Sequence, residues 1–427
     1  MKIAAHTLGC KLNYAETSDL LRRMAAMGHT IVDWNTKADL YIINTCTVTA
    51  VAEKKCRTAI HQAHRKNAEA RVAVIGCFAQ VSAKDIESIP GVTLVLGNDR
   101  KHLLPAIVES EGWTAEGESG GGVPAVASDA SVFPLQYSSG DRTRTFFKIQ
   151  DGCDYFCTYC AIPFARGRSK SATVEETLCM ARRIAAEGAR EVVLTGVNTG
   201  TFGQQHGERF VDLLRGLDAV EGIERYRISS IEPNLLTDDI IDFVAHSRAF
   251  LPHFHIPLQA GSDHVLQLMH RRYDTALYRS KLLRIKEVMP DACIAADIMA
   301  GFNGENEEEF AKTLSFVDSL PISYLHVFTY SDRPGTAALR LGEKVPVPVR
   351  HEHTHRLLEL SERKHNEFIQ SQIGKERPVL WESKHVDMTM EGWTDNYIRV
   401  SRPYDASMVN AVEPVLLTAE NILRQEM

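Results

Sequence analysis

The first part of the chain alternates between two periodicities of apolar residues. Short apolar runs, typical of buried strands, occupy residues 3–8, 40–43, 71–75 and 92–96. Between these runs, apolar residues recur at helical spacing over 15–27, where Gly28 provides a stop, and again over 51–66. Strands that alternate with helices in this way predict a parallel, doubly wound α/β sheet.

The same alternation resumes after a glycine-rich, acidic segment. Residues 109–144 include Ser-Gly-Gly-Gly-Val-Pro, a composition typical of a linker. Beyond it we expect strands at 145–150, 191–197, 225–231, 253–258, 293–299 and 324–330. Helical patterns separate them, including 174–187 and 307–320. Six β/α units predict a partial (β/α)6 TIM-like barrel with its active site at the carboxyl ends of the strands.

The last part of the chain has a third pattern. Residues 350–370 have helical spacing. After them come short β-like runs at 379–381, 397–400 and 415–417. Such runs predict a small antiparallel β-barrel at the carboxyl terminus.

Composition narrows the class of protein. A chain of 427 residues is expected to form two or three domains. It has no run of 18 apolar residues, and its start, Met-Lys-Ile-Ala, is not a signal peptide, so we expect a cytoplasmic protein without a membrane segment. Nine cysteines in such a chain indicate metal binding or catalysis rather than disulfides. A net charge of -7 gives no general attraction to nucleic acid.

Three closely spaced cysteines carry the strongest chemical signal. Cys153, Cys157 and Cys160 form C-x3-C-x2-C directly after an apolar run. A structural zinc site needs four ligands, usually two C-x2-C pairs, and only one such pair is present. A cubane iron–sulfur cluster accepts three thiolates and leaves one iron open for a cofactor. We therefore favour a cluster over zinc, with Tyr159 placed to cover the cluster or a bound adenine.

A second set of cysteines is spread along the amino-terminal part. Cys10, Cys46 and Cys77 each follow the carboxyl end of an expected strand. That edge of a doubly wound sheet is where ligands bind, so three thiolates would converge there and could hold a second cluster. The alternative is three ordinary buried cysteines. The remaining cysteines are expected in the core: Cys56, Cys179 and Cys293.

The cysteine motif, with an aromatic residue before its last cysteine, resembles the signature of the radical S-adenosylmethionine (SAM) superfamily. Over nearly its whole length the chain resembles the methylthiotransferases of that superfamily. The matching stretches are 7–17, 44–49, 167–169, 255–263, 269–273 and 330–336. The first two look most like the branch that modifies threonylcarbamoyladenosine in tRNA. One stretch departs from the family, which usually has proline where this chain has Asn303.

The resemblance implies a domain organisation. Residues 1–108 would carry the auxiliary cluster, 109–138 would be a linker, and 139–370 would be the radical SAM core. Residues 371–427 would form a barrel like the RNA-binding TRAM module. This last part is not basic, so shape and aromatic contacts, with Trp393 and Tyr397 as candidates, would have to contribute to RNA binding.

The resemblance also implies the reaction and its cofactors, two [4Fe-4S] clusters and SAM. One SAM supplies a methyl group to sulfur at the cluster of Cys10, Cys46 and Cys77. Another is cleaved at the other cluster to a 5′-deoxyadenosyl radical, which removes hydrogen from C2 of the modified adenine so that a methylthio group takes its place. We expect SAM contacts from polar residues at the barrel strand ends, although each could equally stabilise a turn: Thr195, Gly196, Asn198, Ser229, Glu232 and Gln259.

The implied partners are the anticodon loop of tRNA, an electron donor such as flavodoxin or ferredoxin, and a sulfur donor, with the enzyme itself a monomer. The target base would be splayed out of the loop into the barrel mouth. Two alternatives stay open from the sequence. One is methylthiolation of another tRNA adenosine or of a ribosomal-protein side chain. The other is an iron–sulfur RNA-binding module without turnover.

Overall fold

The structure is a computed structural model, and it describes residues 1–47, 49–110, 133–140 and 143–423. The linker expected over 109–138 falls mainly on residues 111–132, which lie outside that description. The chain divides into two compact units. Unit 1 consists of Met1–Ser139, Phe146–Asp154 and Cys160–Ala172, and unit 2 consists of Gly140–Thr145, Tyr155–Tyr159 and Thr173–Met427.

Unit 1 is built on a five-stranded parallel sheet in the order β2-β1-β3-β4-β5. Its strands are β1 (Lys2–Thr7), β2 (Thr30–Ile31), β3 (Leu40–Thr45), β4 (Arg71–Gly76) and β5 (Leu94–Leu96). The doubly wound sheet predicted from the apolar pattern is therefore confirmed. Only β2 was not predicted, because its two residues are exposed and form no apolar run.

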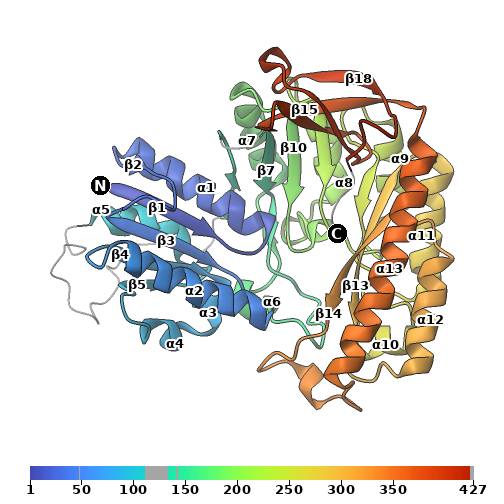
Figure 1. The fold of residues 1–427 in the computed structure, drawn as a ribbon, viewed down its shortest axis with the longest axis horizontal. Helices are drawn as coiled ribbons and strands as arrows, with labels where there is room; N and C mark the ends of the chain where they lie inside the picture. Colours follow the sequence, from blue (N-terminus) through green and yellow to red (C-terminus); the bar gives the residue numbers. More distant parts are fainter. Residues whose placement is uncertain (48, 111–132, 141–142, 424–427) are drawn as a thin grey trace. The chain divides into compact units, whose positions relative to one another are not determined.

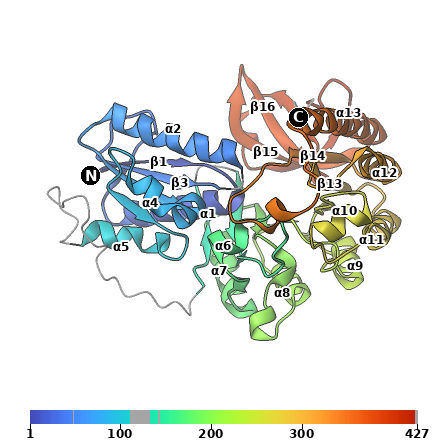
Figure 2. The same cartoon turned by 90° about the horizontal axis from the view of Figure 1, so that it is seen from below.

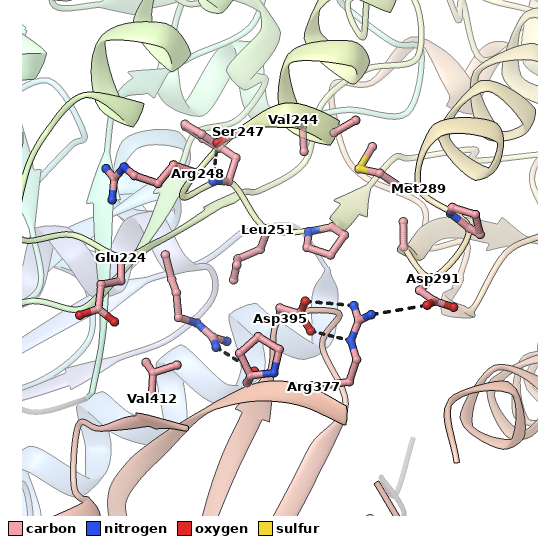
Figure 3. Close-up of a pocket in the computed structure, with 17 residues that line it drawn as sticks. Glu224, Val244, Ser247, Arg248, Leu251, Met289, Asp291, Arg377, Asp395 and Val412 are labelled. Atoms are coloured by element: carbon pink, nitrogen blue, oxygen red, sulfur yellow. Dashed lines mark hydrogen bonds and ion pairs between the residues drawn. The ribbon is translucent and has the colours of Figure 1, made fainter. Parts of the chain in front are cut away.

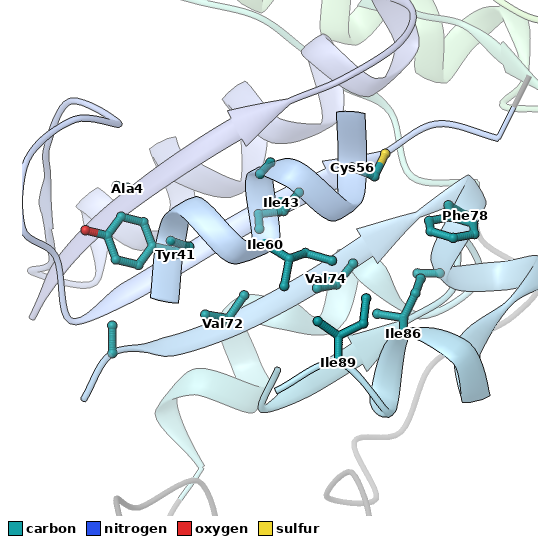
Figure 4. Close-up of a cluster of buried hydrophobic side chains, with 14 of the residues drawn as sticks. Ala4, Tyr41, Ile43, Cys56, Ile60, Val72, Val74, Phe78, Ile86 and Ile89 are labelled. Atoms are coloured by element: carbon teal, nitrogen blue, oxygen red, sulfur yellow. The ribbon is translucent and has the colours of Figure 1, made fainter. Parts of the chain in front are cut away.

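Helices cover both faces of this sheet (Figure 1). One face packs α1 (Lys11–Ala26) and α5 (Leu104–Glu109). The other packs α2 (Ala50–Lys66), α3 (Cys77–Val81) and α4 (Ala83–Glu87). Figure 4 shows the core of this second face, where Ile43 and Val74 of the sheet meet Ile60 of α2. Leu40 and Ile42 belong to the opposite core, because successive strand residues point to opposite faces.

Unit 1 also contains the segments on either side of the cysteine motif. Strands β6 (Gln136–Tyr137) and β7 (Arg144–Lys148) pair antiparallel through Gln136–Lys148 and Tyr137–Phe147. Strands β8 (Gln150–Asp151) and β9 (Lys170–Ser171) form a second antiparallel pair. Between them lies the short helix α6 (Ile162–Arg166).

Unit 2 has the repeated β/α order predicted for a partial barrel. Strands β10 (Glu191–Thr195) and β11 (Arg225–Ile228) pair parallel, as do β12 (His253–His255), β13 (Cys293–Ala300) and β14 (Tyr324–Thr329). The helices are α7 (Val174–Ala186), α8 (Phe210–Asp218), α9 (Asp238–His246), α10 (Asp263–Leu268), α11 (Thr275–Val288), α12 (Glu307–Asp318) and α13 (Val347–Gln372). Figures 1 and 2 both place α13 along the outside of β13 and β14.

Four of these helices begin at a side chain that caps them. The capping residues are Thr173, Ser262, Asp274 and Asn306. Each accepts a hydrogen bond from a backbone N–H of the first turn, which has no partner within the helix. Local sequence therefore defines where the barrel helices start, and with them the lengths of the strand-end loops.

A four-stranded antiparallel sheet ends the chain, in the order β17-β16-β15-β18. The strands are β15 (Glu376–Val386), β16 (Thr389–Thr394), β17 (Arg399–Pro403) and β18 (Val412–Leu416). The antiparallel class was predicted, but β16 was missed because Gly392 interrupts its pattern. A Cβ atom at Gly392 would lie 2.8 Å from the Trp381 ring, so the ring packs where a side chain would stand.

Buried charges attach this sheet to the barrel strands of unit 2. Arg225 donates hydrogen bonds to the carbonyl oxygens of Trp393 and Thr394 at 2.9 and 3.1 Å. Arg227 donates to the carbonyl of Thr394 at 2.7 Å. Both guanidinium groups also pair with Glu191, whose side chain is fully buried. Glu191 thus compensates the charge of both arginines, and their remaining N–H groups donate to backbone carbonyls of the sheet.

Candidate active site

The three cysteines of the amino-terminal sheet lie at one edge of it. Cys10 follows β1, Cys46 follows β3, and Cys77 begins α3 directly after β4. Because β1, β3 and β4 are parallel neighbours, their carboxyl ends meet at the same edge. The strand-end placement predicted for these residues is therefore confirmed.

The backbone at this edge leaves room for cysteine side chains. Gly9 has a φ of +101°, in the left-handed region that favours glycine, and a Cβ atom there would lie 2.8 Å from Cβ and 3.1 Å from Sγ of Cys46. The amide of Asn13 donates to the carbonyls of Leu8 and Thr45 at 2.8 and 3.0 Å. Asn13 thus joins the ends of β1 and β3 just beside Cys10 and Cys46.

Cys77 is held on the same edge by a different amide. The Nδ2 atom of Asn98 lies 3.4 Å from Cys77 Sγ and donates to the carbonyl of Ala165 at 2.7 Å. Ala165 belongs to α6, the helix that follows the C-x3-C-x2-C motif. Within unit 1, one side chain therefore touches both a dispersed cysteine and the segment next to the clustered ones.

Five charged side chains are buried together in unit 1. Lys148 Nζ lies 2.7 Å from Glu16 and 2.8 Å from Asp151, and Arg166 Nη1 lies 2.9 Å from Asp151. Lys101 also pairs with Glu16. All five side chains are at most 5% exposed. Isolated buried charges are costly, so each depends on the others for compensation.

The members of this buried network come from segments beside both cysteine sets. Glu16 is on α1, just after Cys10, whereas Asp151 and Arg166 flank the motif that begins at Cys153. Burial opposes ionisation of Glu16, but Lys101, Lys148 and Arg166 hold its pKa well below the usual range. Burial lowers the pKa of Arg166, but the carboxylates of Asp151 and Glu16 outweigh this effect and raise that pKa. These pKa shifts favour the charged forms of Glu16 and Arg166, whereas burial lowers the pKa of Lys101.

Backbone contacts shape the start of the clustered motif. The N–H of Cys153 donates to the carbonyl of Gly167 at 3.1 Å, and Asp151 accepts from the N–H of Gly152 at 2.8 Å. A Cβ atom at Gly152 would lie 2.0 Å from the carbonyl oxygen of Arg168. The first cysteine thus stands at a tight turn that only glycine allows.

Cys157 and its surroundings belong to unit 2. Arg271 Nη1 donates to Cys157 Sγ at 3.1 Å, and Nη2 of the same guanidinium pairs with Glu232. Burial raises the pKa of Glu232 and that of the Cys157 thiol, and the Arg271 charge opposes both shifts. A thiol beside a cation is suited to act as a thiolate ligand.

The expected SAM-contact residues occupy the carboxyl ends of the barrel strands. Thr195 ends β10, and the half-buried Gly196 and buried Asn198 follow it. Ser229 follows β11, and its N–H donates to the carbonyl of Leu194 at 3.1 Å. The hydroxyls of Thr195 and Ser229 are buried and have no hydrogen-bond partner among the described residues. Orphaned donors at this edge fit the binding of a polar cofactor.

Two further expected residues show signs of constraint. Gln259, after β12, has a φ of +66°, which a residue other than glycine rarely adopts. Its N–H donates to the carbonyl of Asp297 at 2.8 Å, and its carbonyl accepts from Met299 at 2.9 Å. The ring of Tyr159 meets that of Phe302 edge to face, with centroids 6.1 Å apart. The positive φ of Gln259 is backbone strain, which is common at functional sites.

Sequence reasoning missed the polar residues around the cysteines. Arg271 and Asn13 lie inside stretches that carried the family resemblance, which was the available signal for them. Of the buried network, only Glu16 lies in such a stretch, and the pairing of its members had no signal because they are far apart in sequence. Among the remaining cysteines, Cys56 and Cys293 are buried as predicted. The prediction for Cys179 was wrong: it is exposed, since the buried positions Thr177, Ala181 and Ile184 place it on the solvent side of α7.

Asn303, the departure from the family pattern, has a structural role. It is fully buried, and its Nδ2 atom donates to the carbonyl of Ala338 at 2.8 Å. Proline has no side-chain donor for this contact. The substitution therefore replaces a rigid turn residue by a hydrogen bond to the loop after β14.

A separate cavity of about 530 Å³ lies at the opposite end of the barrel strands (Figure 3). Its lining includes Glu224, Leu251 and Asp291, which precede β11, β12 and β13. Arg377 crosses one side and pairs with Asp395 at 2.9 Å and Asp291 at 3.5 Å. Barrel chemistry takes place at the carboxyl ends, so this cavity is not the candidate active site.

Two family models match parts of the chain. Residues 2–97 match a family described as uncharacterized protein family UPF0004, and residues 147–317 match the radical SAM superfamily. Among solved structures, the radical SAM methyltransferase TsrM from Kitasatospora setae has a TM-score of 0.56 at 12% identity, covering 77% of this chain and 72% of that one. The fold and the cysteine motif define a radical SAM enzyme.

Curated relatives extend over nearly the whole chain. The threonylcarbamoyladenosine tRNA methylthiotransferase MtaB of Bacillus subtilis is 38% identical, covering 93% of this chain and 89% of that protein. MtaB of Aquifex aeolicus is 36% identical, covering 94% and 97%. A tRNA-2-methylthio-N(6)-dimethylallyladenosine synthase of Clavibacter michiganensis is 35% identical, covering 88% and 71%.

The chain belongs to the radical SAM methylthiotransferases, in the MtaB branch of that family. Enzymes of this superfamily use SAM and a [4Fe-4S] cluster. The three thiols of the C-x3-C-x2-C motif fit the cluster, and the buried hydroxyls of Thr195 and Ser229 fit a polar cofactor such as SAM. Among the described residues, no helix is both long and apolar enough to cross a membrane.

Proposed function

We propose that this enzyme converts threonylcarbamoyladenosine next to the tRNA anticodon to its 2-methylthio derivative. The observation that carries the proposal is the meeting of Cys10, Cys46 and Cys77 at one sheet edge, in a chain that also has the radical SAM motif. Relatives at 38% and 36% identity bear the name of that activity.

In this proposal the two cysteine sets have different tasks. Cys153, Cys157 and Cys160 hold the cluster that binds SAM, and Cys10, Cys46 and Cys77 hold a second cluster that carries sulfur. Bound there, the cofactors would supply an adenosyl radical and a methylated sulfur. The hydrogen from C2 would leave with 5′-deoxyadenosine, and the methyl group would come from a second SAM.

The chain's own residues orient and enclose these groups. Thr195, Gly196, Asn198, Ser229, Glu232 and Gln259 contact SAM, and Tyr159 covers its adenine. Arg271 donates a hydrogen bond to Cys157 and also pairs with Glu232. The positive charge of Arg271 therefore compensates the Glu232 carboxylate beside Cys157. The two orphaned hydroxyls of Thr195 and Ser229 find partners in the bound cofactor.

The domain roles follow from the same assignment. Residues 1–108 carry sulfur, 139–370 generate the radical, and 371–427 contact tRNA, with 109–138 as a linker. The enzyme acts in the cytoplasm, where tRNA is found, as a monomer. It receives electrons from a flavodoxin or ferredoxin and sulfur from a separate donor.

Two triple variants of the full chain test the proposal. Wild type should bind about eight irons after anaerobic reconstitution, and either set of three Cys→Ala changes should leave about four. The variant without Cys10, Cys46 and Cys77 should still release 5′-deoxyadenosine from SAM but form no methylthio product. The variant without Cys153, Cys157 and Cys160 should release none.

Nucleoside analysis of tRNA from a deletion strain tests the substrate. Loss of 2-methylthio-threonylcarbamoyladenosine, restored by the wild-type gene, is expected. Loss of 2-methylthio-dimethylallyladenosine instead would assign the chain to the activity named for the Clavibacter relative. Unchanged tRNA would favour a protein substrate, and absence of SAM cleavage under any reductant would favour a binding module without turnover.

A further inference from the structure

Three polar side chains outside the cysteine sites gather on one face of the sheet β12–β13–β14. The other face of β14 is covered by α13, because Leu325 and Thr329 hydrogen-bond to Ser361 and Thr354 at 2.8 Å each. Side chains alternate along a strand, so His326 points to the face turned away from α13.

The partners of His326 on this face come from the two neighbouring strands. Asp297 pairs with His326 in register, which places both side chains on the same side of the sheet. His255 ends β12, two positions along the chain from His253 and beside β13. One ligand-type atom from each of His255, Asp297 and His326 lies within 4.8 Å of the other two.

The orientation of His255 is set by a fourth residue. Its Nδ1 atom lies 3.1 Å from the hydroxyl of Ser230, and its Nε2 atom lies 2.7 Å from Asp297 Oδ1. In one tautomer the Ser230 hydroxyl donates to Nδ1 and Nε2–H donates to Asp297; in the other, Nδ1–H donates to Ser230 and Nε2 presents a lone pair beside the carboxylate, the arrangement that can bind a cation. This pattern, an imidazole oriented through its other nitrogen, is usual for metal-bound histidine.

We propose that His255, Asp297 and His326 bind a first-row divalent cation, of the kind represented by Zn²⁺ or Fe²⁺. Two imidazoles and one carboxylate are a ligand set that such ions prefer, and it leaves coordination positions open. This site shares no ligand with either cysteine set and does not depend on the proposed tRNA substrate.

The geometry requires only small adjustments. Metal bonds of about 2.1 Å place tetrahedral ligands about 3.4 Å apart. His255 and Asp297, now at 2.7 Å, would separate slightly to admit the ion. His326 is exposed, and a rotation of its side chain would complete the set. The ring of His326 now meets those of His255 and Tyr324 at centroid distances of 5.2 and 5.3 Å.

Zinc binding to the reconstituted, cluster-loaded full chain tests this proposal. In anaerobic equilibrium dialysis against Zn²⁺, wild type should retain about one zinc per chain at this site, and His326→Gln and Asp297→Asn should each weaken binding by about tenfold or more. The matched control is His355→Gln on α13, whose side chain is 75% exposed and which should bind zinc as wild type does.

Cysteines that lack their cluster could also bind zinc, but the amount of that zinc would be the same in wild type and in the His326→Gln, Asp297→Asn and His355→Gln variants. X-ray absorption at the zinc edge separates the sources, because this site gives nitrogen and oxygen neighbours at about 2.0–2.1 Å, whereas cysteine gives sulfur at about 2.3 Å. If Asp297→Asn does not fold, His326→Gln and Ser230→Ala, expected to weaken binding about tenfold, serve instead. Zinc content that is independent of these residues, or sulfur-only coordination, overturns the proposal.

Discussion

The guanidinium Nη1 of Arg166 lies 3.2 Å from the carboxylate of Glu16, although 150 positions separate the two residues. Glu16 stands on the helix that begins after Cys10, and Arg166 ends the helix that follows Cys160. Within unit 1, this buried ion pair links the helix that follows Cys10 to the helix that follows Cys160. Removing this ion pair should therefore alter the structure beside Cys10 and beside Cys160.

Arg166→Met should destabilise unit 1 strongly. The change leaves Asp151 and Glu16 buried with less positive charge, and breaking a buried pair in this way costs about 3–5 kcal/mol. Urea unfolding of the cluster-free protein measures the loss. The control is Arg168→Met, since that side chain is 77% exposed and should change stability by less than about 0.5 kcal/mol. Equal effects of the two changes would contradict a network held together by Arg166.

Gly9→Ala should disturb the site of Cys46. The added Cβ would lie 2.8 Å from Cys46 Cβ, so the cysteine or the strand end must move. We expect iron content after reconstitution to fall from about eight towards about four per chain, with SAM cleavage retained. Gly28→Ala is the matched control, because Gly28 has a similar φ of +90° but no atom within 4 Å of the added Cβ. Both variants pay the backbone strain of about 1 kcal/mol, and only the first should lose iron.

Glu191 should make the attachment of the carboxyl-terminal sheet sensitive to acid. Burial raises its pKa, but Arg227, Arg225 and Arg144 together lower it from 4.5 to about 2. A lowered pKa stabilises the folded state above pH 4.5, and this stabilisation is lost as the pH falls from 4.5 towards about 2. The contribution is roughly 3 kcal/mol.

Glu191→Gln tests that expectation in the cluster-free protein. It should be less stable at neutral pH, since two arginines lose their counter-charge, and its stability should depend less on pH in the acid range. Tryptophan fluorescence is a suitable signal, because the carbonyl of Trp393 accepts a hydrogen bond from Arg225. An unchanged acid profile would show that Glu191 does not control it.

Arg271→Met should lower the reduction potential of the cluster that Cys157 is proposed to bind. The guanidinium donates to Cys157 Sγ at 3.1 Å, and a positive hydrogen-bond donor favours the reduced cluster. A fall on the order of 60 mV would correspond to a tenfold change in the one-electron equilibrium. Potentiometric titration followed by EPR measures it. Arg272→Met serves as the control, since Arg272 lies over the Tyr155 ring at 4.2 Å instead; equal potentials in all three proteins would refute the role of Arg271.

The fold class could be predicted well because local patterns control it. Apolar runs and helical spacing locate β1, β3, β4 and β5 within a few residues, and they separate the parallel units from the antiparallel end. The failures have local causes as well. Two exposed residues do not identify β2, and Gly392 hides β16 because its missing side chain is replaced by packing from Trp381.

In the candidate site, too, local features could be predicted from the sequence and long-range contacts could not. The sequence by itself determined the six cysteines at strand ends and in the motif, since cysteine spacing and the alternation of strands with helices are local properties of the sequence. Only the tertiary structure decided that Glu16, Asp151 and Arg166 form one buried network, and that His255, Asp297 and His326 share a face. Those contacts join residues far apart in the chain, and charge compensation between them exists only once folding has removed the water.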